Sequence, residues 1–293
     1  MRQAAIAGLS AIRSEEVTNH AGRIAAELVA DLRTRGTADL VGDYCKPLAS
    51  RMFCLLVGLD EAEADGISDA VDAIADQLNG VPGRATAADA AAGHLRSSME
   101  RLAAKHRTAL ISAMEARLGP DSPATAADLA ASFIFDAVEM VATGLLGVIN
   151  LTRRPDFAEV LQGRYLLKDA VQEAFRLVTP ATLTSRMALE TVEWRGHTIA
   201  AGTPLIMWWG SGNLDPAVFV EPALFNPNRP VRRHLAFGIG SHACIGRQFA
   251  SAVTEAAVEA LLLAPGKRAQ PVGETVFLPR LVRVAERAPV TFT

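Results

Sequence analysis

A glycine-rich segment that carries a single cysteine is the feature that most constrains this chain. Its sequence, F-G-I-G-S-H-A-C-I-G at residues 237–246, stands directly before a predicted helix at residues 247–263. Glycines permit positive φ angles and let the backbone approach a flat ligand closely. A cysteine near a helix N-terminus is biased towards the thiolate by free N–H groups and the helix dipole. Cys244 is therefore predicted to be a metal ligand, the alternative being a small buried core residue.

Composition and charge narrow the class of protein. The 293 residues have a net charge of −3 with no block of like charge, which argues against a nucleic-acid or membrane partner and favours a small molecule. Hydrophobic residues make up 50% of the chain and charged residues 21%, as in a folded, helix-rich protein. Three cysteines are too few for a disulfide framework, and the first residues show no signal peptide. A cytoplasmic protein is expected.

Apolar residues with a period near 3.6 predict helices over most of the first 178 residues. The most apolar of these helices is long enough to span a bilayer, but Asp136 and Glu139 in its middle favour a buried core helix. Thr125, followed three residues later by Asp128, predicts its N-cap. The expected helices cover residues 14–36, 45–59, 60–78, 90–118, 129–150 and 165–178.

The pattern changes after residue 183. Residues 183–209 alternate and are rich in β-branched and aromatic residues, with turn signals at Arg195-Gly196 and Ala201-Gly202, which predicts short strands. Residues 215–246 form an irregular stretch much longer than an ordinary loop, which is typical of functional loops. Residues 276–292 are predicted to form a terminal strand pair.

The cysteine segment resembles the haem-binding loop of the cytochrome P450 family, FGxGxHxCxG, at every fixed position. Two further patterns follow the order of that family. Glu173 and Arg176 resemble its Glu-x-x-Arg pair, and Arg229, in the sequence F-N-P-N-R, resembles the residue that adds a third charge to the pair. An isolated Glu-x-x-Arg pair on a helix is more often a solvated surface pair. Its position ahead of the cysteine segment favours the family assignment.

The resemblance implies a mainly α fold with a small β region, a cytochrome P450-like fold that lacks its N-terminal part. The A and B helices and part of the C helix have no counterpart, so a naturally short protein and a fragment are both expected alternatives. The implied arrangement is one haem-binding domain over residues 1–293, with a helical part at 1–178, short strands and the haem-ligand loop at 183–246, and a helix and terminal strands at 247–293.

The resemblance also implies the cofactor, haem b (iron protoporphyrin IX), with Cys244 as the axial thiolate ligand of the iron. Donors to the haem propionates and an aromatic ring near the sulfur are implied as well. The family takes a further propionate-binding cation from its C helix, but Arg2 is too isolated in the sequence to be assigned that role. The implied cofactor-binding residues are Arg186, Phe237, Gly238, His242, Cys244 and Gly246, and the implied structural residues are Glu173, Arg176 and Arg229.

The apolar helix is implied to carry the oxygen-activation motif of the family, a glycine, an acid and a threonine. Counting back from Arg154-Pro155 places Glu139 at the acid and Met140 at the threonine, and a shift of three places Asp136 at the threonine. Neither alignment restores an alcohol, and a thioether cannot donate a proton, so an impaired proton relay is expected. Glu139 and Asp136 are the candidate catalytic residues, the alternative being satisfied polar groups in a buried helix.

The implied function is a haem-thiolate enzyme of the monooxygenase type that oxidises a small organic molecule in bacterial secondary metabolism. The missing threonine leaves open a peroxide-driven reaction, or a dehydration, isomerisation or cyclisation. The second hypothesis is a non-catalytic partner or activator of another biosynthetic enzyme. Ferredoxin and ferredoxin reductase are the implied redox partners, with Arg232, Arg233 and Arg247 as docking cations or, alternatively, a solvated face. A homodimer that covers the haem is a further alternative.

Overall fold

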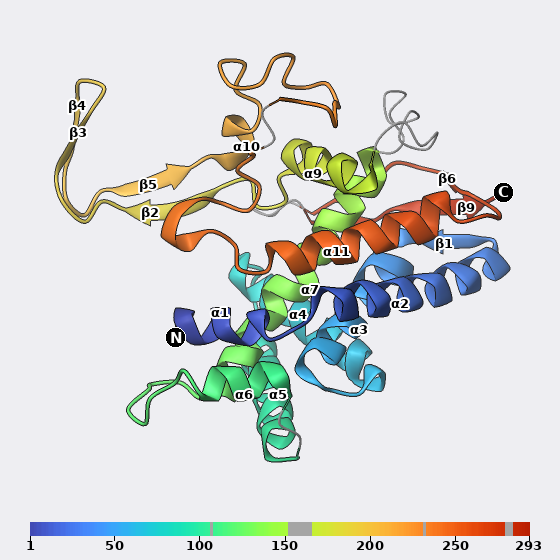
Figure 1. Cartoon of the computed structure of the whole chain (residues 1–293), viewed down its shortest axis with the longest axis horizontal. Helices are drawn as coiled ribbons and strands as arrows, with labels where there is room; N and C mark the ends of the chain where they lie inside the picture. Colours follow the sequence, from blue (N-terminus) through green and yellow to red (C-terminus); the bar gives the residue numbers. More distant parts are fainter. Residues whose placement is uncertain (106–107, 152–165, 231–232, 279–283) are drawn as a thin grey trace.

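The computed structural model describes residues 1–105, 108–151, 166–230, 233–278 and 284–293, and it is mainly helical. The helices form the body of the molecule, with small sheets towards its edges (Figure 1). Short 3-10 or π segments at Val41–Cys45, Glu61–Glu63, Gly240–His242 and Glu259–Leu263 adjoin several of them. The helices are α1 (Arg2–Ser10), α2 (Ser14–Arg35), α3 (Lys46–Val57), α4 (Ala64–Leu78), α5 (Ala85–Lys105), α6 (Ala109–Glu115), α7 (Ala126–Leu151), α9 (Leu167–Val178), α10 (Trp209–Gly212) and α11 (Arg247–Val258).

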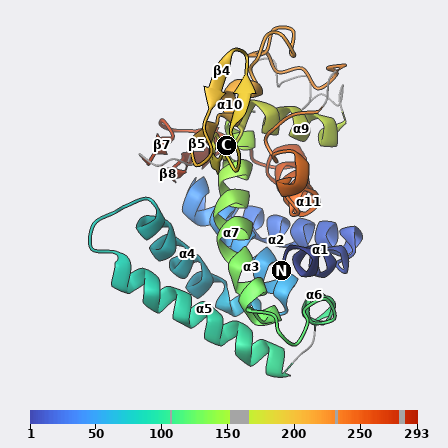
Figure 2. The same cartoon turned by 90° about the vertical axis from the view of Figure 1, so that its left-hand side faces the viewer.

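Helix α7 is the central element, and the other helices pack around it (Figure 2). It contacts α3, α4, α5, α9 and α11. The predicted N-cap is confirmed: Thr125 Oγ1 accepts a hydrogen bond from the Asp128 backbone N–H at 3.1 Å, and Asp128 Oδ2 accepts from the Thr125 N–H at 2.9 Å. By length and composition α7 is the one helix of the described residues able to cross a membrane, but 65% of its most apolar window is buried inside the protein. This burial agrees with the predicted core helix.

Glycines in the left-handed region end two of the predicted helices. Gly36 follows α2 with φ 78°, as its sequence position predicts, and Gly58 follows α3 with φ 91°. A Cβ atom at Gly58 would lie 2.3 Å from the Thr108 Cγ2 methyl, so no larger residue fits there. Helix α3 is therefore closed by a residue that also lets the start of α6 approach it.

The single helix predicted at residues 90–118 is wrong. The structure has two helices in this region, α5 and α6, and the second starts afresh at Thr108. The Thr108 Oγ1 accepts a hydrogen bond from the Ile111 backbone N–H at 3.2 Å, which satisfies one free donor of the new helix. The sequence pattern predicts one uninterrupted helix here, so this N-cap was not recognised. Helix α9 agrees with its prediction, except that Tyr165 lies outside the described residues.

The strands form small antiparallel sheets. The predicted short strands after residue 183 are confirmed, and Arg195 and Gly196, both with positive φ, turn β3 into β4. The predicted terminal strand pair within residues 276–292 is confirmed, because β7 pairs with β8. The sequence did not reveal that β9 joins a second sheet, where it lies between β6 and the unpredicted strand β1. Strands β2 and β5 form an arm that carries the β3–β4 hairpin at its tip (Figure 1). The strands are β1 (Thr37–Asp39), β2 (Thr184–Met187), β3 (Val192–Trp194), β4 (His197–Ile199), β5 (Pro204–Met207), β6 (Ala269–Pro271), β7 (Val276–Phe277), β8 (Ala285–Arg287) and β9 (Pro289–Phe292).

Candidate haem-binding site

The glycine-rich loop folds back on itself and leads into α11. The backbone N–H of Cys244 donates to the Phe237 carbonyl at 2.8 Å, and the N–H of Ala243 donates to the Gly240 carbonyl at 3.1 Å. Gly238 and Gly240 have φ angles of 64° and 73°, a region that favours glycine. The loop therefore holds the cysteine backbone in a fixed turn directly before the helix.

Cys244 differs from the other two cysteines, all three of which the structure describes. Cys45 and Cys54 are buried, and burial raises the pKa of both thiols far above the ordinary value. Cys244 is exposed. The pKa of its thiol is raised overall, chiefly by partial shielding from water, and hydrogen bonding to the Gly246 and Arg247 N–H groups at the start of α11 opposes that rise. Among the cysteines, Cys244 alone has the access and the N–H donors that a thiolate ligand needs.

Helix α7 brings Asp136 towards this loop. The Asp136 charge is near enough to raise the pKa of the Cys244 thiol, and partial desolvation raises the pKa of the Asp136 carboxyl itself. Glu139, the other predicted acid, is only 2% exposed and belongs to the buried side of α7. Met140 is half-buried, and Arg154 and Pro155, on which the alignment depended, lie outside the described residues. The structure thus brings one of the two acids to the cysteine side.

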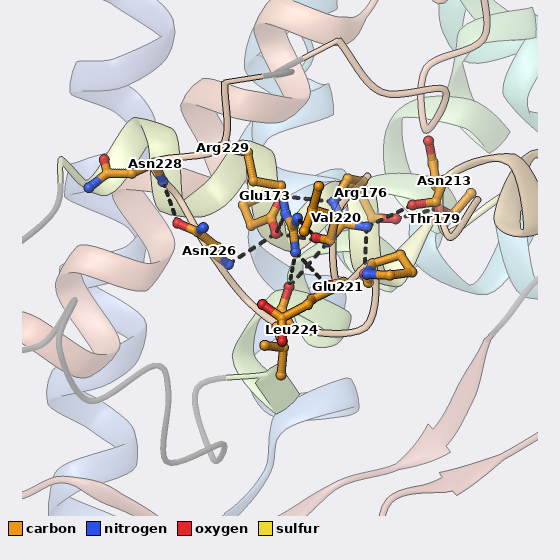
Figure 3. A network of polar contacts seen from close by, with 11 residues as sticks. Glu173, Arg176, Thr179, Asn213, Val220, Glu221, Leu224, Asn226, Asn228 and Arg229 are labelled. Atoms are coloured by element: carbon orange, nitrogen blue, oxygen red, sulfur yellow. Dashed lines mark hydrogen bonds and ion pairs between the residues drawn. The ribbon is translucent and has the colours of Figure 1, made fainter. Parts of the chain in front are cut away.

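The predicted Glu-x-x-Arg pair is a buried ion pair (Figure 3). Arg176 Nε and Nη2 donate to the two carboxylate oxygens of Glu173, both at 2.8 Å. Arg229 Nε donates to Glu173 Oε1, also at 2.8 Å, and the backbone N–H of Asn226 reaches the same oxygen at 3.0 Å. The side chains of Arg176, Glu173 and Arg229 are 2%, 6% and 7% exposed, so the solvated-surface alternative does not apply.

The remaining guanidinium donors of this network bind backbone carbonyls of the irregular stretch. Arg176 Nη1 donates to Asn213 O at 2.7 Å and to Pro222 O at 2.8 Å, and Arg229 Nη2 donates to Leu224 O at 2.7 Å. One carboxylate and two guanidiniums therefore fix a stretch that has almost no regular secondary structure of its own. The network anchors the chain that leads to the cysteine loop.

Asn213 extends this network and was not apparent from the sequence. It is fully buried. Its Nδ2 donates to Thr179 Oγ1 at 2.7 Å, and its Oδ1 accepts from the backbone N–H of Leu235 at 2.6 Å. Asn213 thereby joins the end of α9 to the segment that precedes Phe237. Because its partners lie 34 and 22 residues away, no local pattern could have identified it.

The two predicted propionate donors are both exposed. Arg186 lies on β2, where its Nη1 donates to the Ser185 carbonyl at 2.7 Å. His242 lies in the 3-10 turn of the cysteine loop. Their contact with a propionate stays a prediction.

Arg2 also lies at this site, although no sequence pattern assigned it a role there. Its Nη2 donates to the Ala243 carbonyl at 2.9 Å, one residue before Cys244. Helix α1 is held against α6 so closely that a Cβ at Gly8 would lie 2.8 Å from Met114. Arg2 and Cys244 both line a cavity of about 340 Å³ between α1 and α11. Only the tertiary packing of α1 reveals this position.

The donor set fits an iron porphyrin. An exposed thiol at a helix N-terminus supplies the soft ligand, and the cations Arg2 and Arg186 suit the carboxylates of a propionate-bearing ring. Gly238 has a φ of 64°, a conformation that side-chain-bearing residues rarely adopt, so a glycine suits this part of the loop. Within the described residues, no group of three His, Cys, Asp or Glu side chains offers an alternative metal site. The predicted cation Arg232 lies outside the described residues.

Comparisons with known proteins agree with this geometry. A sequence model of the family described as Cytochrome P450 matches residues 137–264. The 20-oxo-5-O-mycaminosyltylactone 23-monooxygenase of Streptomyces fradiae is 31% identical, over 85% of this chain and 61% of its own length. The 6-deoxyerythronolide B hydroxylase of Saccharopolyspora erythraea is 30% identical, over 85% of this chain and 63% of its own length. The chain thus spans about three-fifths of the length of these relatives.

Solved structures give the same result for the fold. CYP105P1 in complex with filipin I matches with a TM-score of 0.87 and 27% identity, over 100% of this chain and 76% of that structure. CalO2 matches with a TM-score of 0.86 and 25% identity, over 98% of this chain and 76% of that structure. Similarity along most of the sequence, joined to a fold that superposes over nearly all of it, shows that the chain belongs to the cytochrome P450 family.

Proposed function

We propose that the chain is a haem-thiolate oxidoreductase of the monooxygenase type that acts on a small organic molecule in bacterial secondary metabolism. The observation that carries the proposal is Cys244, an exposed thiol beside the free N–H groups at the start of α11. The names of two relatives, a 20-oxo-5-O-mycaminosyltylactone 23-monooxygenase and a 6-deoxyerythronolide B hydroxylase, support the reaction class and the substrate class.

In this proposal the cofactor is haem b, and Cys244 would supply its thiolate ligand. When bound, a thiolate-ligated iron porphyrin supplies the oxidising chemistry. Arg2, Arg186 and His242 would hold the propionates, and Phe237 would lie near the sulfur. The protein's own task is to orient Cys244. Desolvation raises the pKa of its thiol, and the N–H groups of Gly246 and Arg247 partly offset this rise in favour of the thiolate.

Of the two predicted acids, Asp136 is the one we propose to hold a proton during the reaction. Its raised pKa keeps the carboxyl protonated to a higher pH than an ordinary aspartate, and its charge reaches Cys244. Glu139 is only 2% exposed. With Met140 in place of an alcohol, a peroxide-driven or non-oxygenating reaction is the alternative form of this proposal. Product formation with peroxide alone, compared with ferredoxin and its reductase, separates the two.

The proposed setting is the cytoplasm, with ferredoxin and ferredoxin reductase as the electron source. Arg233 and Arg247, both exposed near the cysteine loop, are the proposed docking cations for an acidic partner. Charge reversal at Arg233 is expected to slow electron transfer at low ionic strength and to matter less in high salt. A homodimer remains the alternative cover for the site, and light scattering over a range of concentrations tests it.

The first experiment is the ferrous–carbon monoxide difference spectrum of the purified, haem-loaded chain. A thiolate-type Soret band is expected, and it should be lost in Cys244→Ser. The matched control is Cys54→Ala, which changes a buried cysteine and should keep the band. A spectrum without any haem band would overturn the proposal in favour of the non-catalytic partner or activator.

A further inference from the structure

His234 is a buried histidine to which neither the sequence patterns nor the proposed ligand set gives a role. It is 6% exposed and stands three residues before Phe237. Its Nδ1 accepts a hydrogen bond from the backbone N–H of Ala236 at 3.3 Å, so this nitrogen carries no proton. The proton of the neutral ring is therefore on Nε2, which faces Gln172 Oε1 at 3.3 Å.

Gln172, on α9, connects this histidine to α11. Its Oε1 also accepts from Arg247 Nη2 at 3.0 Å, and its Nε2 donates to Ser251 Oγ at 2.9 Å. Because arginine only donates, the oxygen of the amide must be the atom that faces Arg247, and the same orientation suits Nε2–H of His234. One side chain of α9 thus joins α11 to the segment before the cysteine loop.

Phe237 is enclosed by the same group of residues. Its ring lies 5.0 Å from the Phe175 ring and 5.8 Å from the His234 ring, and the Arg247 guanidinium carbon lies 5.6 Å from its centroid. The Phe237 carbonyl in turn accepts the N–H of Cys244 at 2.8 Å. Any displacement of Phe237 is therefore passed directly to the cysteine backbone.

We propose that His234, held by Gln172, is a positioning residue for Cys244 that acts through Phe237. The inference rests on the proposed function, because the orientation of the thiol matters for ligation. The neutral state of the ring supports this positioning role. Burial above all, together with the nearby Arg247 and Arg176 charges, lowers the pKa of His234 to about 4, although Glu173 acts in the opposite direction. At neutral pH Nδ1 thus remains free to accept the Ala236 N–H.

Three variants separate the contacts of this unit. His234→Phe keeps an aromatic ring beside Phe237 and removes both hydrogen bonds. His234→Asn keeps an acceptor near the Ala236 N–H and shortens the side chain away from Gln172. Gln172→Met removes the amide at similar length. The matched control is His197→Phe, the same substitution at an exposed position of β4.

Two readouts report on the thiol itself. The first is the rate at which the thiolate-type ferrous–carbon monoxide band of the haem-loaded protein changes to the neutral-thiol type at pH 7. The second is the alkylation rate of Cys244 in the haem-free full chain, with circular dichroism as the check of folding. We expect both rates to rise roughly tenfold in His234→Phe, the factor typical of one buried hydrogen bond lost, and less in His234→Asn. His197→Phe should match the parent.

The outcomes distinguish this inference from the proposed function. If the parent has no thiolate-type band, the proposed function fails and the alkylation rates alone decide whether His234 positions Cys244. If the parent has the band and every folded variant matches it in both rates, the positioning role is wrong. Should His234→Phe fail to fold, His234→Asn and Gln172→Met give the same decision.

Discussion

Burial gives the cysteines of this chain different chemistry. Cys45 and Cys54 are enclosed by the core and Cys244 is exposed at the start of α11. We expect a small alkylating reagent to modify one thiol of the haem-free, folded chain, at Cys244, because a thiolate must form and be reached before it reacts. Mass spectrometry of the intact protein and of its peptides gives the number and the position. Equal labelling of Cys54 under native conditions would contradict the burial described.

His234 makes stability depend on pH in the acid range. Its folded pKa of about 4 lies below the ordinary value of 6.5, so its contribution is fully present above pH 6.5 and is lost as the pH falls towards 4. The loss should reach about 3 kcal/mol for this buried group. Denaturant unfolding at pH 7, 5.5 and 4 measures it. The decrease in unfolding free energy from pH 7 to pH 4 should be smaller in His234→Phe, because phenylalanine cannot titrate, and unchanged in His197→Phe.

The contribution of Asp136 to stability depends on pH in the opposite direction. Because its folded pKa is raised, the folded state holds the proton more tightly than the unfolded state, so stability from this group is present at low pH and decreases as the pH rises above about 4. Asp136→Asn removes that decrease. The variant should therefore gain stability relative to the parent between pH 4 and pH 7 in denaturant unfolding. Asp69→Asn, at an exposed position of α4, is the control, and an equal gain there would show that the effect is not local.

At the scale of elements, the ion network on α9 offers a comparison within one chain. Glu173 and Arg176 form a buried pair three residues apart, and Arg13 and Glu16 form an exposed pair with the same spacing. Glu173→Gln leaves two buried guanidiniums without their anion and should cost about 3–5 kcal/mol of unfolding free energy. Glu16→Gln should cost far less, because its pair with Arg13 is exposed to solvent. Similar losses of unfolding free energy in the two variants would mean that burial does not determine how much an ion pair of this spacing stabilises the protein.

The elements that the sequence predicted are those with local signals. The stop at Gly36 and the cap formed by Thr125 and Asp128 depend on residues within one helical turn, and both were found. The break at Thr108 was missed because most of the residues around it favour helix and its cap is a single hydrogen bond to Ile111. The packing of Thr108 against Gly58 comes from a distant part of the chain. Strand β1 was missed because it becomes a strand only by pairing with β9.

The same distinction holds for the site as a whole. Cys244, Glu173, Arg176 and Arg229 belong to short patterns, so the sequence alone marked them as candidates. Asn213, Gln172, His234 and Arg2 reach the cysteine loop through partners that lie between 22 and 241 residues away, or through a helix whose packing the sequence did not reveal. A residue that acts through a tertiary contact leaves no local pattern in a single sequence.

The placement of β9 between β1 and β6 sets an order of events during synthesis. Thr291 donates through its hydroxyl to the Gly36 carbonyl, a contact that spans 255 residues of sequence. At ordinary translation rates the ribosome needs roughly 10 to 50 s to add that many residues. Throughout that interval the first strand leaves the exit tunnel without its neighbour and exposes an unpaired edge. The nascent chain should therefore be a client of ribosome-associated chaperones until its final strand arrives.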